Sequence, residues 1–179
     1  MRRFPVLVGS HDIYRGRVVN LRVDTIEVAD GENVRREVVE HPGAVVLVPV
    51  DSEGRLLWVR QYRYAVDREL LELPAGTLER GEAPEACARR EVAEETGFEA
   101  GSLEMLGSFF TAPGFCTEYM HAYAATGLTP ARDAHADDDE DIQVEPLTIE
   151  EALARIDEGA IVDAKSIAAL FLYLRKHPR

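Results

Sequence analysis

Short stretches in which apolar and polar residues alternate open the chain and predict β-structure. Residues 17–29 alternate loosely, a turn follows at 30–33, and residues 34–41 return as a partner strand. Alternation on both sides of a turn that contains Asp, Gly and Asn predicts an antiparallel hairpin. Because this hairpin is too small to fold as a domain by itself, we expect an N-terminal β arm over residues 1–42 and a main domain over residues 43–179.

The main domain begins with longer apolar runs. Residues 44–50 and 56–64 flank a turn at 51–55, which predicts a second hairpin of buried strands that contains Trp58 in the core. Further strands are expected at residues 103–110, 118–126 and 142–147.

Two segments carry clear helix boundaries. The first begins near Pro84, a residue suited to an opening turn, and ends at Gly97, the residue type that most easily adopts a left-handed cap. The second begins at Thr148, which forms a capping-box pattern with Glu151, and ends near Gly159. Both helices are therefore bounded by their own local sequence.

A last helix is predicted over residues 164–176, behind a capping Asp163. Four apolar residues recur at helical spacing and are expected in the core: Ile167, Leu170, Phe171 and Leu174. Strands and helices interleave without regular alternation. This order favours an α+β fold, a sandwich of sheets between helices, over a parallel doubly wound sheet.

Composition narrows the classes of function. The 179 residues are 46% hydrophobic, and 33 acidic against 20 basic residues give a formal net charge of −13. That charge disfavours binding to nucleic acid or to an anionic membrane. Cys87 and Cys116 show no zinc-site spacing, and no apolar run approaches the length of a membrane span, so we expect a cytoplasmic protein with reduced thiols.

The first predicted helix carries a crowd of like charges in the segment "RREVAEETG", residues 89–97. Glu91, Glu94 and Glu95 are helical neighbours, and each close pair costs about 0.2–0.5 kcal/mol through repulsion. Glu91 and Glu95 project only about 40° apart, next to the expected buried face. A solvated acidic surface is one interpretation of this pattern. The other is a site for a hard divalent cation, with Mg²⁺ the natural candidate and Mn²⁺ the alternative.

Neighbouring residues can complete such a site. Arg90 precedes Glu94 by four residues and could orient it through a charge-assisted hydrogen bond, which leaves Glu91 and Glu95 for the metal. Gly76 permits a close approach of the backbone, so the carbonyl of Ala75 could supply a further oxygen ligand.

The whole stretch over residues 76–98 resembles the Nudix box, the signature of a family of pyrophosphohydrolases. Gly76, Glu82 and the run that starts at Arg90 occupy its defining positions, and seven fixed identities at preset spacings coincide by chance on the order of once in 10⁸ windows. The resemblance implies a Nudix-type α/β/α sandwich with a mixed sheet. It also implies that Ala75, Glu91 and Glu95 hold the metal.

Segments outside the box resemble the ADP-ribose pyrophosphatase branch of that family. These are "VRQYR" at 59–63, "LPAG" at 73–76 and "TAPGF" at 111–115, which contains a proline characteristic of this branch. The resemblance implies Mg²⁺-dependent hydrolysis of ADP-ribose to AMP and ribose 5-phosphate by a homodimer with exchanged N-terminal arms. A pyrophosphatase for another nucleotide sugar or ADP-linked compound, and a non-catalytic ADP-ribose sensor, are the alternatives.

The same resemblance assigns candidate residues to the substrate. They are Arg63, Thr77, Pro113 and Gly114, together with Arg36 and Glu37 in the arm, which would reach the substrate of the partner subunit. Because the arm lacks an aromatic residue there, Arg36 is expected to stack through its guanidinium plane. An ordinary turn is the alternative interpretation of Pro113 and Gly114.

The general base implied by the resemblance lies in the acidic segment 135–144, whose only glutamate is Glu140. Glu140 is therefore expected to take the proton from water and to serve as a further metal ligand. Asp138, Asp139 and the box residue Glu94 remain alternatives for the base. Composition alone would also allow a solvated loop.

Overall fold

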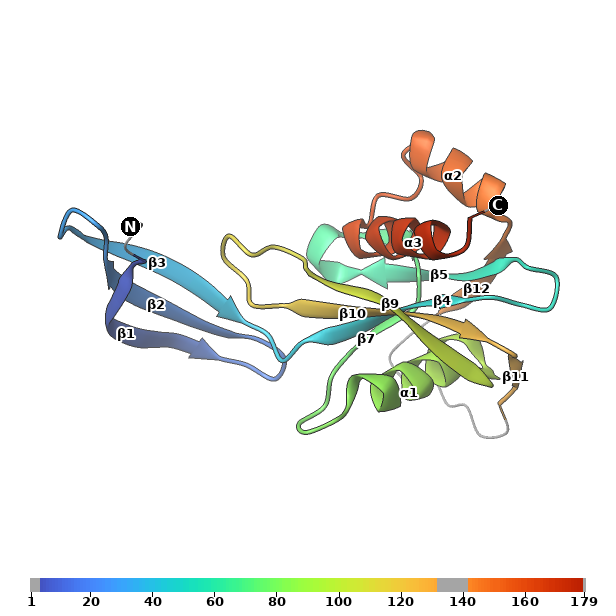
Figure 1. The fold of residues 1–179 in the computed structure, drawn as a ribbon, viewed down its shortest axis with the longest axis horizontal. Helices are drawn as coiled ribbons and strands as arrows, with labels where there is room; N and C mark the ends of the chain where they lie inside the picture. The colour runs from blue at the N-terminus through green and yellow to red at the C-terminus, as the bar shows by residue number, and fades with distance from the viewer. Residues whose placement is uncertain (1–3, 132–141, 179) are drawn as a thin grey trace. The chain divides into compact units, whose positions relative to one another are not determined.

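A computed structural model of the protein describes residues 4–131 and 142–178. The chain divides into two compact units (Figure 1). One unit contains the N-terminal residues up to Gly43 together with Phe110–Tyr119, and the other contains Ala44–Phe109 and the residues from Met120 onward.

The first unit is built on an antiparallel sheet in the order β1-β2-β3. Its strands are β1 (Val6–Arg15), β2 (Asn20–Glu27) and β3 (Asn33–Glu40). The segment 110–119 belongs to the same unit because Val39 N–H donates to the carbonyl of Phe115 and Val39 O accepts from Thr117 N–H, at 2.8 and 2.9 Å. The hairpin β2-β3 agrees with the sequence pattern.

Strand β1 was not predicted. All ten of its residues are exposed, so none of them packs into the core of this chain. The strand therefore needs no regular alternation of apolar and polar residues, and the sequence gives no such signal there.

The second unit contains a mixed sheet in the order β7-β4-β10-β9. Its strands are β4 (Ala44–Pro49), β7 (Ala75–Thr77), β9 (Ser102–Phe110) and β10 (Tyr119–Thr126). Strand β4 pairs with β10 in parallel and with β7 in antiparallel orientation. All six residues of β4 are buried, as expected for a central strand that is covered on both faces.

A second, antiparallel sheet of this unit has the order β12-β5-β6. It consists of β5 (Leu56–Arg63), β6 (Arg68–Glu72) and β12 (Gln143–Leu147), with the short helix η1 (Tyr64–Val66) between β5 and β6. A further two-stranded pairing joins β8 (Phe98–Glu99) to β11 (Thr129–Pro130).

The predicted second hairpin, residues 44–50 with 56–64, is wrong. Apart from a single bridge between Val50 and Leu56, strands β4 and β5 belong to different sheets. In sequence, two apolar strands joined by a short turn are typical of a hairpin. In the structure β4 pairs with β10 and β7, whereas β5 pairs with β12 and β6. These pairings depend on segments that are distant in sequence.

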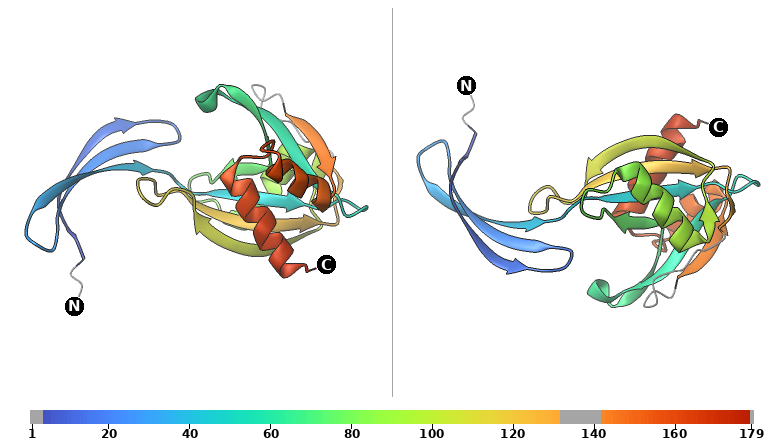
Figure 2. Two further views of the ribbon diagram at one scale, coloured as in Figure 1. Left: turned by 90° about the horizontal axis from the view of Figure 1, so that it is seen from above. Right: turned by 90° about the horizontal axis from the view of Figure 1, so that it is seen from below.

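Helices cover both faces of the mixed sheet (Figure 2). Helix α1 (Pro84–Thr96) packs on the face of Val45, Leu47 and Tyr123, and α3 (Ala164–Lys176) packs on the opposite face through Ala169 and Leu170. Helix α2 (Ile149–Asp157) contacts β12. The Nudix-type α/β/α sandwich expected from the sequence is confirmed.

The predicted helix boundaries are also confirmed. Gly97 caps α1 with a left-handed φ of 75°, and Thr148 forms the capping box of α2 with Glu151. The Asp163 side chain accepts from Ser166 N–H at the start of α3. Each of these caps depends on residues within four positions of one another, which is why the sequence alone could indicate them.

The predicted core is confirmed with one exception. Trp58 is fully buried, Leu170 is 1% exposed, and Ile167 and Leu174 pack against the same core. Phe171, by contrast, is 62% exposed. It follows Leu170 by 100° around the helix, and this rotation carries it off the face that meets the sheet. Within the described part of the chain, no helix is long and apolar enough to cross a membrane.

Candidate active site

The candidate site is built where α1 packs against the strand β7. Buried Cys87, Ala88 and Val92 fix α1 on the sheet. Glu91 and Glu95 share one flank of the helix next to that face, and each is only 8% exposed. The acidic segment singled out in the sequence is therefore not a fully solvated helix surface.

Glu91 occupies space that a side chain at position 76 would need. A Cβ atom built on Gly76 would lie 1.7 Å from Cδ of Glu91, well inside any permitted contact. The glycine is thus required by the close approach of the Glu91 carboxylate to the backbone.

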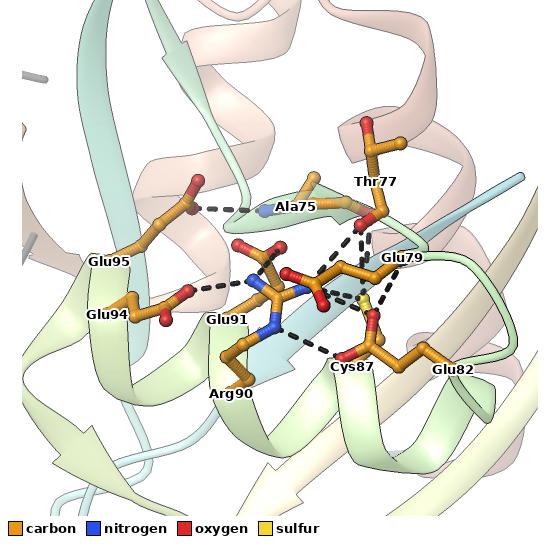
Figure 3. A network of polar contacts seen from close by, with 10 residues as sticks. Ala75, Thr77, Glu79, Glu82, Cys87, Arg90, Glu91, Glu94 and Glu95 are labelled. Carbon is orange, nitrogen blue, oxygen red and sulfur yellow. Dashed lines mark hydrogen bonds and ion pairs between the residues drawn. The ribbon is translucent and has the colours of Figure 1, made fainter. Parts of the chain in front are cut away.

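Glu95 forms a hydrogen bond with Ala75, the residue of β7 that precedes Gly76. Its Oε2 accepts a hydrogen bond from Ala75 N–H at 3.0 Å (Figure 3). The carbonyl of Pro74 accepts from Leu47 N–H on β4 at 2.8 Å. Because successive residues of a strand direct their N–H and C=O groups to alternate sides, both groups of Ala75 point away from β4, toward the Glu95 side. This orientation agrees with the expected role of the Ala75 carbonyl.

Arg90 lies among three carboxylates (Figure 3). It bonds Glu94 at 2.8 Å, as predicted, but it also bonds Glu91 at 2.7 Å and Glu82 at 3.1 Å. The hydrogen bonds with Glu82, ahead of the other contacts, raise the pKa of Arg90 well above its usual range and lower that of Glu82. Glu82 was recognised as a position of the box but not as a partner of Arg90, because a separation of eight residues gives no helical signal.

The residues of this cluster suit a divalent cation. Glu82, Glu91, Glu94 and Glu95 contribute four negative charges against one positive charge on Arg90, a formal surplus of three. The oxygens near Gly76 are two buried carboxylates and a backbone carbonyl, which are the hard ligands that Mg²⁺ and Mn²⁺ prefer. No group of three acidic, His or Cys side chains in the described ranges has the arrangement of a complete metal site.

The thiol of Cys87 is buried beside the same cluster. Burial, followed by the charges of Glu91 and Glu82, raises the pKa of Cys87 to about 12. A thiol that stays protonated is a poor nucleophile and a poor metal ligand.

Arg63, a predicted substrate residue, is anchored by a buried glutamate that the sequence interpretation missed. The Arg63 guanidinium donates to both carboxyl oxygens of Glu72, at 3.1 and 2.8 Å. Lys165 of α3 forms a second ion pair with Glu72. Glu72 is 1% exposed. The signal that could have identified it is a single acidic residue within the apolar run "LLELP".

The remaining predicted residues are distributed over the chain. Thr77 lies on β7, where its carbonyl is 3.4 Å from Arg90. Arg36 and Glu37 are exposed on β3, and Pro113 and Gly114 are exposed in the turn of the same compact unit. Glu140, with Asp138 and Asp139, lies outside the described residues.

Comparison with known proteins agrees with the fold and the box. The profile of the NUDIX domain matches residues 39–170. The chain is 42% identical to a methanol dehydrogenase activator of Bacillus methanolicus, over 91% of this chain and 89% of the relative. It is 37% identical to an ADP-ribose pyrophosphatase of Bacillus subtilis, over 94% and 92% of the two chains.

A solved structure described as an ADP compounds hydrolase matches the fold with a TM-score of 0.88. The match covers 100% of this chain and 98% of that one at 23% sequence identity. The chain therefore belongs to the Nudix family, and it is a Nudix hydrolase that is similar to ADP-ribose pyrophosphatases.

Replacing Gly76 with alanine should displace the Glu91 carboxylate, because the added Cβ occupies its place. We expect kcat on a nucleotide-sugar diphosphate to fall by about tenfold or more, the order of loss seen when groups around a metal are disturbed. The circular dichroism spectrum should remain that of the wild type. Steady-state kinetics of Gly76→Ala, Glu91→Gln and the double variant test this, since two losses with one cause should not add. Additive losses would contradict the steric explanation.

The buried Glu72 should make stability depend on pH. Burial by itself would raise its pKa, but Arg63 and Lys165 outweigh burial and leave the pKa of Glu72 below its usual value. A carboxylate with a depressed folded pKa stabilises above its unfolded pKa, about 4.3, and loses this contribution as pH falls through the folded value. Glu72→Gln should therefore be less stable than the wild type at pH 7, by a margin that narrows below about pH 4.

Urea unfolding at a series of pH values measures this margin. Glu69→Gln replaces an exposed glutamate on the same strand and serves as the matched control. A margin for Glu72→Gln that stays constant down to pH 3 would rule out the ionic origin of the stabilisation.

Proposed function

We propose that this enzyme hydrolyses ADP-ribose to AMP and ribose 5-phosphate in a Mg²⁺-dependent reaction. The convergence of Glu91, Glu95 and the Ala75 backbone beside Gly76 carries the proposal. The choice of ADP-ribose is supported by the identity to ADP-ribose pyrophosphatases, 37% and 39% over more than nine-tenths of this chain. The "TAPGF" segment, with Pro113, supports the same choice.

In this proposal Ala75, Glu91, Glu95 and Glu140 hold the metal. A divalent cation bound there would polarise the phosphoryl group and neutralise charge that develops during its transfer. Arg90 holds Glu91 and Glu94 in place through the bonds described above. A strongly acidic protein would otherwise repel a diphosphate, so the dependence on metal should be absolute.

The chemical step is the attack of water on one phosphorus of the diphosphate. The bond from that phosphorus to the bridging oxygen breaks, and the water proton passes to a carboxylate. Glu140 is the proposed acceptor, with Asp138, Asp139 and Glu94 as alternatives. Arg63, Thr77, Pro113 and Gly114 are proposed to contact the substrate, and Arg36 and Glu37 of the arm are proposed to reach the substrate of the partner subunit.

We further propose that the active form is a homodimer in which the N-terminal arms, residues 1–42, are exchanged. The arm leaves large apolar side chains exposed in the single chain, which a partner subunit could cover: Phe4, Val6, Leu7, Val8, Ile13 and Tyr14. Sedimentation equilibrium should give twice the mass of 19.9 kDa. A monomer at the concentrations used in activity assays would rule out this arrangement.

Activity tests the leading proposal directly. With Mg²⁺ and ADP-ribose the wild type should release AMP. Glu95→Gln should lower kcat by about 100-fold or more, because it replaces a charged metal ligand with a neutral one and so weakens the stabilisation that the cation gives to the phosphoryl group. Glu85→Gln changes an exposed glutamate on the same helix, paired with Arg89, and should retain the wild-type rate. A non-catalytic sensor would instead bind ADP-ribose without turnover.

A pyrophosphatase for another nucleotide sugar is the second candidate, because the residues of the box do not indicate which group the substrate carries at the far end of its diphosphate. Measurement of kcat/KM for ADP-ribose, ADP-glucose and GDP-mannose distinguishes the two. A preference for either of the last two would replace ADP-ribose as the substrate and leave the hydrolytic chemistry unchanged.

The role of the base is tested separately. Glu140→Gln at saturating Mg²⁺ should reduce kcat by about 10²–10⁴-fold, the usual contribution of a general base. Asp138→Asn is the companion variant in the same segment. If Glu140→Gln keeps a near-normal rate and Asp138→Asn does not, the proton acceptor is Asp138.

A further inference from the structure

The short segment that supplies the Ala75 carbonyl is held at three consecutive residues by three different elements. Leu73 N–H donates to Oγ of Ser166 on α3 at 2.7 Å, and Pro74 O accepts from Leu47 N–H on β4 at 2.8 Å. Ala75 N–H donates to Glu95 on α1 at 3.0 Å. The contact of Pro74 with Leu47 continues the pairing of β7 with β4, and the contact of Ala75 with Glu95 involves a residue of the box. The contact of Leu73 with Ser166 is explained by neither feature.

The hydroxyl of Ser166 is fully buried and has a defined orientation. It donates to Oδ2 of Asp163 at 2.5 Å, and the same carboxylate accepts Ser166 N–H at 2.9 Å as the cap of α3. Since the hydroxyl proton is committed to Asp163, its oxygen is left to accept the hydrogen bond of Leu73. Nζ of Lys165 lies 3.0 Å from the same Oδ2 atom of Asp163.

Capping of α3 does not require this arrangement. The Asp163 carboxylate already satisfies Ser166 N–H. At the start of α2, the hydroxyl of Thr148 hydrogen-bonds with Glu151 in the first turn of its own helix. The Ser166 hydroxyl instead joins α3 to Leu73, which lies 93 residues away between β6 and β7. It therefore acts on the segment and not only on the helix.

We propose that Ser166 is a positioning residue for the metal site. By fixing Leu73, it fixes the direction in which the carbonyl of Ala75 points relative to Glu95. The intervening Pro74 transmits this constraint, because its ring locks one of the backbone torsions between the two residues. The inference rests on the proposed function, in which Ala75, Glu91 and Glu95 bind the metal.

Direct titration with Mn²⁺ tests the proposal without reliance on turnover. Ser166→Ala removes the hydroxyl and leaves the backbone bond to Asp163 in place. We expect its Kd for Mn²⁺ to rise by about tenfold, the lower end of the range for groups that orient metal ligands. Thr148→Ala also removes a hydroxyl from the first turn of a helix, but it should bind Mn²⁺ like the wild type.

Two further variants separate orientation from charge. Asp163→Asn keeps an acceptor for the hydroxyl and should leave the Kd for Mn²⁺ close to that of the wild type. Asp163→Ala removes the acceptor and should weaken Mn²⁺ binding even if Ser166→Ala proves too unstable to purify. In kinetic assays, the metal concentration for half-maximal rate should rise for Ser166→Ala, while kcat at saturating metal stays within about twofold of the wild type.

Unchanged Mn²⁺ affinity in both Ser166→Ala and Asp163→Ala would overturn the proposal. A loss of Mn²⁺ affinity in Thr148→Ala equal to that in Ser166→Ala would also overturn it, because the effect would then reflect general destabilisation. If the wild type hydrolyses ADP-ribose while these variants bind Mn²⁺ normally, only this inference fails. If the wild type neither binds Mn²⁺ nor hydrolyses ADP-ribose, the proposed function fails with it.

Discussion

The site depends on one close approach, that of the Glu91 carboxyl to the backbone of Gly76. Helix α1 can pack this near to β7 only because residue 76 has no side chain, since a Cβ there would lie 1.7 Å from the carboxyl carbon. The same packing brings Glu95 within hydrogen-bond distance of Ala75. The absence of a side chain at a single position thus allows two glutamates of a helix to lie against the backbone of a strand.

Charge is balanced differently around Glu72 and around Arg90, both in the second compact unit. Glu72 of β6 is paired with both Arg63 of β5 and Lys165 of α3. These ion pairs neutralise its charge and link the three elements. Around Arg90, one cation serves three carboxylates. A cluster that keeps excess charge at low exposure is the arrangement expected of a site that binds a cation, whereas a satisfied ionic network serves the structure.

The segment 73–75 shows how the fold unites these parts. Its backbone bonds reach Leu47, Glu95 and Ser166, which are distant in sequence and belong to a strand and two helices. Arg63 is held by Glu72, the residue immediately before this segment. The anchor of Arg63 and the backbone that meets Glu95 are therefore adjacent in the chain, at the passage from β6 to β7.

The sequence by itself determined the parts of this protein that depend on local spacing. Gly97, the Thr148–Glu151 pair and Asp163 delimit the helices because caps involve residues within one turn. The box was recognisable because its identities lie within 23 consecutive positions, 76–98. Only the tertiary structure decided which sheets receive β4 and β5, that Phe171 faces outward, and that Glu72 pairs with Lys165 from 93 residues away. These outcomes arise from contacts between distant segments, and a one-dimensional pattern carries no record of which distant segments will meet.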